Sequence, residues 1–273
     1  MANPKTGGGL GTNQYQVRGR PKLKSAPPRM ALLYDLYTKS KIARDLDTPT
    51  ATLAVLAQDQ NYHVRATVAE NWSCPDHILE KLALDEQQTV RCGVARNESC
   101  STKILMQLAR DKDNNVRWLA TAHPRCTPQM LIQLAQDEDA QVRQQVAKHS
   151  QAPHPVFDLL AQDKNTYVRL ALAGNSRCPP KILAELAHDT DAEVRTRVLL
   201  HAQCPPKTLA FMANSHDKRE RRNVIYHPKC PPTVLIQLLS DEEASVRKAA
   251  RDTIRERADI PDEIRVLAAL INE

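Results

Sequence analysis

The chain contains few of the residues that all-β and α/β enzymes use in quantity. Only 7 glycines stand among 273 residues, and aromatic residues make up 4% of the chain. Leu, Ala, Val, Gln, Arg and Asp dominate instead, a composition that favours helices. No apolar run reaches the roughly 18 residues of a membrane span, and residues 1–30 lack the apolar segment of a signal peptide. We therefore expect a helical, cytoplasmic protein without a membrane contact.

Disulfides are not expected, and acidic residues are missing from one end of the chain. The 7 cysteines are an odd number, which fits a reducing compartment better than a disulfide framework. The net charge is +6, and residues 1–29, which lack acids, account for all of it. The cations of this segment are Lys5, Arg18, Arg20, Lys22, Lys24 and Arg29. Because the segment is rich in Gly and Pro and has almost no apolar residue to bury, it is interpreted as a disordered basic tail.

One pattern dominates the rest of the sequence, a repeat with a period of 26 residues. The dipeptide Val-Arg returns at this interval, and Glu220-Arg221 fills its one gap. An Asp precedes each Arg by six residues, except where Ser215 stands, and a Cys series keeps the same interval with Ala152 in one place. The Val-Arg pairs lie at 64–65, 90–91, 116–117, 142–143, 168–169, 194–195 and 246–247. Self-similarity at a fixed interval of this size indicates a solenoid.

Each unit reads as two short helices. In residues 75–85, Ile78, Leu79 and Leu82 form one apolar stripe, and Val90 belongs to the inward face of the helix that follows. Neither helix is long enough to be stable alone, and each buries only one side, so stacked neighbours must complete the core. The sequence therefore predicts an all-α fold of about eight two-helix repeats.

The units have the form VRxxVAxN…CPxxxLxxLAxD and resemble the leucine-rich repeat variant, a relative of the HEAT and armadillo repeats. The resemblance covers about residues 38–255 and implies a right-handed α-solenoid of the armadillo/HEAT type, whose usual activity is binding. A founding member of that family carries an iron–sulfur cluster on cysteines ahead of its repeats. Residues 1–73 contain no cysteine here, so no cofactor is expected. The expected parts are a tail (1–29), a capping helix with a degenerate half repeat (30–48), the repeats (49–255) and a C-terminal capping helix (256–273).

The Asp and Arg series is interpreted as a structural ladder, in which each Asp accepts hydrogen bonds across its turn and each Arg bridges neighbouring units. A row of acids or a charged binding track is the alternative, but a catalytic site needs one copy, whereas a fold needs one in every unit. The predicted ladder residues are Asp85, Arg91, Asp111, Arg117, Asp137, Arg143, Asp163, Arg169, Asp189 and Arg195. Ser215 and Glu220 depart from the pattern, so we expect the ladder to be weakest there.

Three His-x-x-Cys pairs, at 123/126, 201/204 and 227/230, look like metal ligands. Each pair offers two of the four ligands that zinc needs, and the next unit lies about one helix layer, roughly 10 Å, away. The histidine position is held in other units by Asn71, Asn97 and Asn175. An amide cannot replace an imidazole on zinc, but both suit a helix C-terminus, where Asn97 fits a left-handed residue. We therefore expect no metal, and Cys92, outside the series, is left without a role.

The segment "RGRPK" at 18–22 resembles the core of an AT-hook, which lies in the narrow minor groove of A·T-rich DNA. The candidate nucleic-acid-binding residues are Arg18, Arg20, Lys22 and Lys24. A motif this short also arises by accident in such a composition, so a merely solvated basic tail is an equal alternative.

The variable surface of the second helices is the other candidate. In HEAT-like solenoids these helices line the concave wall, and here that wall would be basic toward its C-terminal half. The candidate partner-binding residues are Arg96, Trp118, Lys148, Arg197, Arg222, Tyr226 and Lys248. An ordinary solvated face is the alternative. Trp118 is the favoured anchor, because exposed tryptophans are enriched in binding hot spots.

The first hypothesis is a non-enzymatic scaffold that holds a protein partner along its inner curve, with no small-molecule substrate. The second is a DNA-binding protein that uses the tail and the basic wall. A remote third is a HEAT-like DNA glycosylase, which would need an aromatic residue, an acid and a cation around one flipped base.

Overall fold

The computed structural model describes residues 28–270 of the chain. Regular structure in this range is helical throughout, which confirms the expected all-α repeat architecture. Eight pairs of short helices follow one another, each with a first helix of 7 residues. The pairs are α2 (Thr50–Leu56) and α3 (Tyr62–Ala69), α4 (Asp76–Leu82) and α5 (Gln88–Arg96), α6 (Thr102–Leu108) and α7 (Asn114–Ala122), α8 (Pro128–Leu134) and α9 (Ala140–Lys148), α10 (His154–Leu160) and α11 (Thr166–Ala173), α12 (Pro180–Leu186) and α13 (Ala192–Leu199), α14 (Pro206–Met212) and α15 (Lys218–Tyr226), and α16 (Pro232–Leu238) and α17 (Ala244–Glu256).

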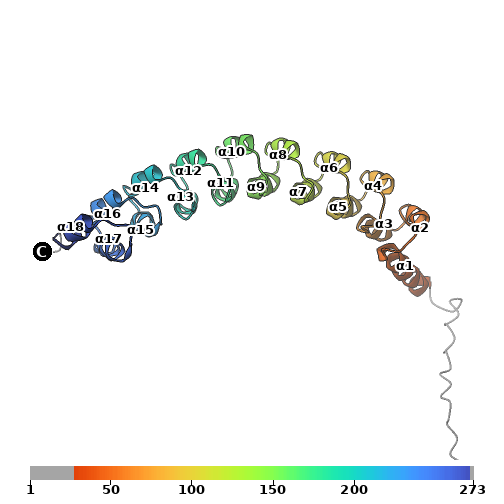
Figure 1. Ribbon diagram of the computed structural model, residues 1–273. Helices are drawn as coiled ribbons and strands as arrows, with labels where there is room; N and C mark the ends of the chain where they lie inside the picture. The colour runs from red at the N-terminus through yellow and green to blue at the C-terminus, as the bar shows by residue number, and fades with distance from the viewer. Residues whose placement is uncertain (1–27, 271–273) are drawn as a thin grey trace, which may run out of the picture.

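The pairs stack side by side into an open arc (Figure 1). The first helices, α2 to α16, form the outer, convex layer, and the second helices, α3 to α17, form the inner, concave layer. Consecutive second helices pack against each other, as α3 does against α5 and α9 does against α11. The concave surface is therefore made of second helices, one from each repeat.

Stacking buries the apolar stripes of both layers in one continuous core. In the second repeat, Ile78, Leu79 and Leu82 of α4 and Val90 and Val94 of α5 are all buried. Helices this short do not persist alone in water, so most of their stability comes from contacts within and between repeats. The curved rod is thus held together junction by junction.

Helices outside the eight pairs close the two ends of the stack. At one end, α1 (Pro28–Arg44) packs against α3, and at the other α18 (Asp262–Leu270) packs against α16 and α17. Because α1 is continuous over 17 residues, the expected capping helix and the first part of the expected half repeat form one element. The predicted disordered tail lies outside the described residues, except for its last two positions, which begin α1. No described helix is long and apolar enough to cross a membrane.

Candidate binding surface

An arginine near the start of each second helix from α3 to α15 joins its repeat to the next one. Nε of Arg143 donates to Oδ2 of Asp163 at 2.6 Å, and Nη2 donates to Oδ1 at 3.0 Å. Nη1 of the same guanidinium donates to the carbonyl oxygens of Asp137 and Glu138 at 2.7 and 3.1 Å. One side chain therefore fixes the turn of its own repeat and holds the carboxylate of the following repeat in a planar, bidentate pair.

This contact recurs along the arc, and we call the series the Arg–Asp ladder. Its pairs are Lys39–Asp59, Arg65–Asp85, Arg91–Asp111, Arg117–Asp137, Arg143–Asp163, Arg169–Asp189, Arg195–Glu220 and Arg221–Asp241. Burial opposes ionisation of Asp163, but hydrogen bonds from Arg143 and from the N–H of Asn165 outweigh it and lower the pKa of the carboxyl group. The side chains of Arg143 and Asp163 are only 7% and 6% exposed. The charges of this pair are therefore used by the fold and are largely shielded from solvent.

The seventh repeat keeps the ladder with a different residue. Ser215 stands where the other repeats have Asp, and Glu220 stands where they have a buried Val. The carboxylate of Glu220 is buried and accepts from Nε and Nη2 of Arg195 at 2.9 and 2.8 Å and from the Ser215 hydroxyl at 2.6 Å. The two changes compensate each other, so Arg195 still meets a carboxylate and the ladder continues through this repeat. That the ladder is weakest there stays a prediction.

A second ladder, made of Asn and His side chains, lies at the ends of the second helices. Nδ2 of Asn97 donates to the carbonyl oxygen of Asn71 at 2.8 Å, and its Oδ1 accepts from the N–H of Ser99 at 2.9 Å. His123 does the same: Nε2 donates to the carbonyl oxygen of Asn97 at 3.0 Å, and Nδ1 accepts from the N–H of Arg125 at 3.0 Å. Amide and imidazole exchange in this position because each offers one acceptor and one donor on the required sides.

The geometry of this Asn/His ladder sets the protonation of its histidines. Because Nδ1 of His123 accepts a hydrogen bond, Nε2 carries the proton and the ring is neutral. Burial lowers the pKa of His123 and of His227, although the hydrogen bond of each ring to a carbonyl oxygen opposes this shift. The backbone of Asn97 is extended, with φ −73° and ψ 109°. The left-handed conformation expected for Asn97 is therefore wrong, and its side chain bridges to the preceding repeat instead.

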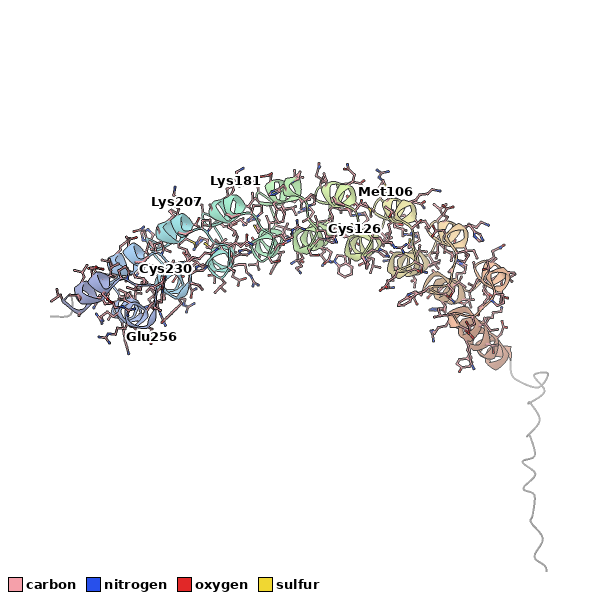
Figure 2. All side chains as sticks on the ribbon, in the orientation of Figure 1. Met106, Cys126, Lys181, Lys207, Cys230 and Glu256 are labelled. Atoms are coloured by element: carbon pink, nitrogen blue, oxygen red, sulfur yellow. The ribbon has the colours of Figure 1, made fainter. Side chains whose placement is uncertain are left out.

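The cysteines fill space between the layers. All are free and buried, and burial raises the pKa of the Cys126 thiol to about 11. Figure 2 places Cys126 in the body of the arc, between the two layers. No group of three or more His, Cys, Asp or Glu side chains within residues 28–270 could hold a metal ion. Cys92 is buried where α3 and α5 approach closely, since a Cβ on the neighbouring Gly93 would lie 3.0 Å from the carbonyl oxygen of Ala66.

The inner wall is the surface that the two ladders leave free. We define it as the positions two before and one, two and five after the ladder arginine on each second helix. It exposes aromatic side chains, with Trp118 39% and Tyr226 59% accessible to solvent. Arg96 is paired with Glu70 at 3.6 Å. The remaining cations expected to bind a partner, Lys148, Arg197, Arg222 and Lys248, are exposed and have no carboxylate within 4.0 Å among the described residues.

One hollow opens on the inner wall where α9, α11 and α13 lie side by side. It has a volume of about 300 Å³, and its lining residues are Gln144, Lys148, Tyr167, Leu170, Ala171, Gly174 and Arg197. Lys148 is on α9 and Arg197 is on α13, so the two cations flank α11. The Arg197 side chain lies across Gly174, with Cδ and Nε 3.5 Å from the point that a Cβ would occupy. Tyr167 is 66% exposed, so the hollow combines an accessible ring with two cations.

A solved structure shares this architecture. A leucine-rich repeat variant with a novel repetitive protein structural motif is 25% identical to this chain, with a TM-score of 0.56 over 79% of this chain and 88% of that one. This chain shares the fold of that protein, a stack of two-helix repeats. The Escherichia coli protein YibA is 19% identical, with a TM-score of 0.36 over 89% of this chain and 100% of that one. A designed armadillo repeat protein in complex with the peptide (KR)4 is 16% identical, with a TM-score of 0.22 over 85% and 95%. No family model matches the sequence, and no curated protein matches it.

In this chain, the surface residues expected from the sequence all lie on the inner wall, from Arg96 on α5 to Lys248 on α17. The tail residues Arg18, Arg20, Lys22 and Lys24 lie outside the described residues. Tyr167 and Gly174 are not among the expected residues. Tyr167 lies two positions before its ladder arginine, whereas the sequence interpretation considered only positions after it. The signal was present, because this position is as variable between repeats as the others on the inner wall.

Proposed function

We propose that the protein is a non-enzymatic binding scaffold that holds a protein partner on its inner wall. The observation that carries the proposal is that recurring and variable side chains have different surroundings in the fold. Side chains that recur from repeat to repeat form the contacts of the two ladders and the core, as Arg143 and Asn97 do. Residues that vary between repeats, such as Trp118 and Tyr226, are exposed on the concave surface.

The exposed residues are of the kinds that dominate protein interfaces. Aromatic residues and arginines are enriched in binding hot spots. Tyr and Trp bury a large area at a small entropic cost, and the planar guanidinium of Arg makes several hydrogen bonds at once. On the inner wall, Trp118, Tyr167 and Tyr226 stand on α7, α11 and α15, and exposed arginines lie on the helices between and beside them. A partner that runs along the arc can therefore meet an aromatic side chain on every second repeat.

The test is comparative capture of a partner from an extract of the source cells. The bait is the full chain, and the variant is Trp118→Ala combined with Tyr226→Ala. The matched control is Phe211→Ala, which removes a 48% exposed ring from α14 on the convex layer. The proposal expects one partner, identified by mass spectrometry, to be retained by the parent and the control and lost by the inner-wall variant. Equal retention by all three proteins would contradict it.

DNA binding is the second candidate, and the unpaired cations near the C-terminal end of the inner wall favour it. Six cations in the tail can also contact phosphates in a salt-dependent manner. The test is retention on duplex DNA at two salt concentrations, for the full chain and for a chain that begins at residue 28, where α1 starts. Loss of all salt-sensitive retention in the shorter chain would restrict DNA binding to the tail. Failure of the full chain to bind at low salt would eliminate this candidate.

The glycosylase alternative has the least support. Helices α5, α7 and α9, which surround Trp118, contain no acidic residue at all. An acid is part of the trio that such an enzyme would need around a flipped base. This alternative would gain support only if the protein released alkylated bases from DNA and lost that activity on Trp118→Ala.

A further inference from the structure

The charge of the inner wall is uneven along the arc. On α3, α5 and α7, the cation Arg96 is offset by Glu70. From α9 to α17 the cations outnumber the acids. The cations are Lys148, Arg197, Arg219, Arg222 and Lys248, and the acids are Glu193 and Asp252. Since none of these five cations has a carboxylate within 4.0 Å among the described residues, the fold does not use their charge.

The hollow between α9 and α13 is where this charge can act on one group. Lys148 and Arg197 approach it from two sides, and none of its lining residues is acidic. Two cations beside a hollow without an acidic lining residue produce a local positive potential, which a single bound carboxylate can partly neutralise. Leu170 and the exposed ring of Tyr167 supply an apolar surface next to that position.

The spacing of the helices sets the form of a matching ligand. Neighbouring helix layers are about 10 Å apart, and an extended chain advances about 3.3 Å per residue. An extended segment that crosses the second helices therefore meets a new inner-wall stripe about every third residue. A segment with acids at this interval places carboxylates near the cations of α9, α13, α15 and α17, whereas α11 offers Tyr167 and Leu170 instead of a cation.

We propose that the inner wall from α9 to α17 binds an acidic, extended segment of a protein partner. One carboxylate of the segment lies between Lys148 and Arg197, and a neighbouring apolar side chain packs against Leu170 and Tyr167. This inference rests on the proposed function and specifies the chemistry of the partner.

The experiment measures binding of the full chain to labelled peptides by fluorescence anisotropy. The probe is fluorescein-labelled (Glu-Glu-Leu)4, and the comparison peptides are (Gln-Gln-Leu)4 and (Lys-Lys-Leu)4. We expect binding of the acidic peptide alone, weakened by added salt because exposed charges are screened. The variant Lys148→Glu with Arg197→Glu is expected to weaken binding by about tenfold or more, because it replaces two attractions by repulsions.

The matched control reverses the same number of charges on the opposite face. Lys181 and Lys207 lie on α12 and α14 and project from the outer edge of the arc (Figure 2). Lys181→Glu with Lys207→Glu keeps the same net charge as the inner-wall variant and is expected to bind as the parent does. All four positions are exposed, and thermal unfolding followed by circular dichroism checks that each variant is folded.

Several outcomes would overturn the inference. They are equal binding of the neutral or the basic peptide, no binding of the acidic one, an unchanged affinity in the inner-wall variant, or an equal loss in the control. Preference for a short DNA duplex over the acidic peptide would also overturn it, in favour of nucleic acid. If the captured partner depends on Trp118 and Tyr226 but is retained by the charge-reversed variant, this inference fails while the proposed function stands.

Discussion

The compensated junction between the sixth and seventh repeats can be tested with a double-mutant cycle. Glu220→Val leaves the Arg195 guanidinium without a carboxylate. Because Arg195 is 24% exposed, water solvates part of the freed charge, and we expect a loss of about 2 kcal/mol rather than the roughly 3–5 kcal/mol of a fully buried pair. Ser215→Asp alone places a second carboxylate beside the buried one of Glu220, and the expected loss is again about 2 kcal/mol.

The double variant restores the residues that the other repeats have at both positions. We expect its stability to lie within about 0.5 kcal/mol of the parent, so that the two changes are coupled by about 4 kcal/mol. The assay is urea unfolding of all four proteins followed by far-ultraviolet circular dichroism. Hydrogen exchange of α13 and α15 locates the effect, since solenoids can unfold in parts. If the losses of the two single variants simply add in the double variant, the compensation described for Ser215 and Glu220 does not exist.

Three further predictions concern the repeated contacts. Arg143→Ala is expected to lower the free energy of unfolding by about 3–5 kcal/mol, because it leaves the carboxylate of Asp163 buried without its partner. Arg143→Lys should recover only part of this loss, since an ammonium cannot form the bidentate pair. Equal urea midpoints for the two variants would contradict the bidentate geometry. Burial lowers the pKa of His123 and His227, so the imidazoles of the unfolded chain bind protons at a higher pH than those of the folded chain. The contribution of these histidines to the free energy of unfolding is therefore fully present above about pH 6.5 and is lost as the pH falls below it. Replacing both histidines by Asn keeps their hydrogen bonds and should flatten this pH dependence of the urea midpoint, and an unchanged slope would refute the assignment. The Cys126 thiol, whose pKa is raised to about 11, should react with Ellman's reagent only after unfolding, and prompt reaction of the folded protein would show that it is accessible.

The features that could be predicted from the sequence are those that recur. The constant six-residue separation of Asp137 and Arg143 and of their copies indicates a contact required by every repeat, and the exchange of His123 with Asn97 predicts a structural role for this position. What could not be predicted depends on directions in space. Nothing in the sequence says that the position of Glu220 points toward the ladder, so the sequence predicts a weak point at Ser215 and Glu220 and not a replacement of one carboxylate by another. Likewise Tyr167 faces the concave side only because its helix is turned that way by packing.

The partner of each ladder cation comes from the following repeat, and this has a consequence for how such a chain can change its length. Loss or duplication of a whole 26-residue block rejoins an arginine to a carboxylate, whichever block is involved. The exception is a crossover that falls between Ser215 and Glu220, which would leave one product with two acids at a junction and the other with none. A change in the number of repeats therefore keeps every ladder charge paired as long as Ser215 and Glu220 are inherited together.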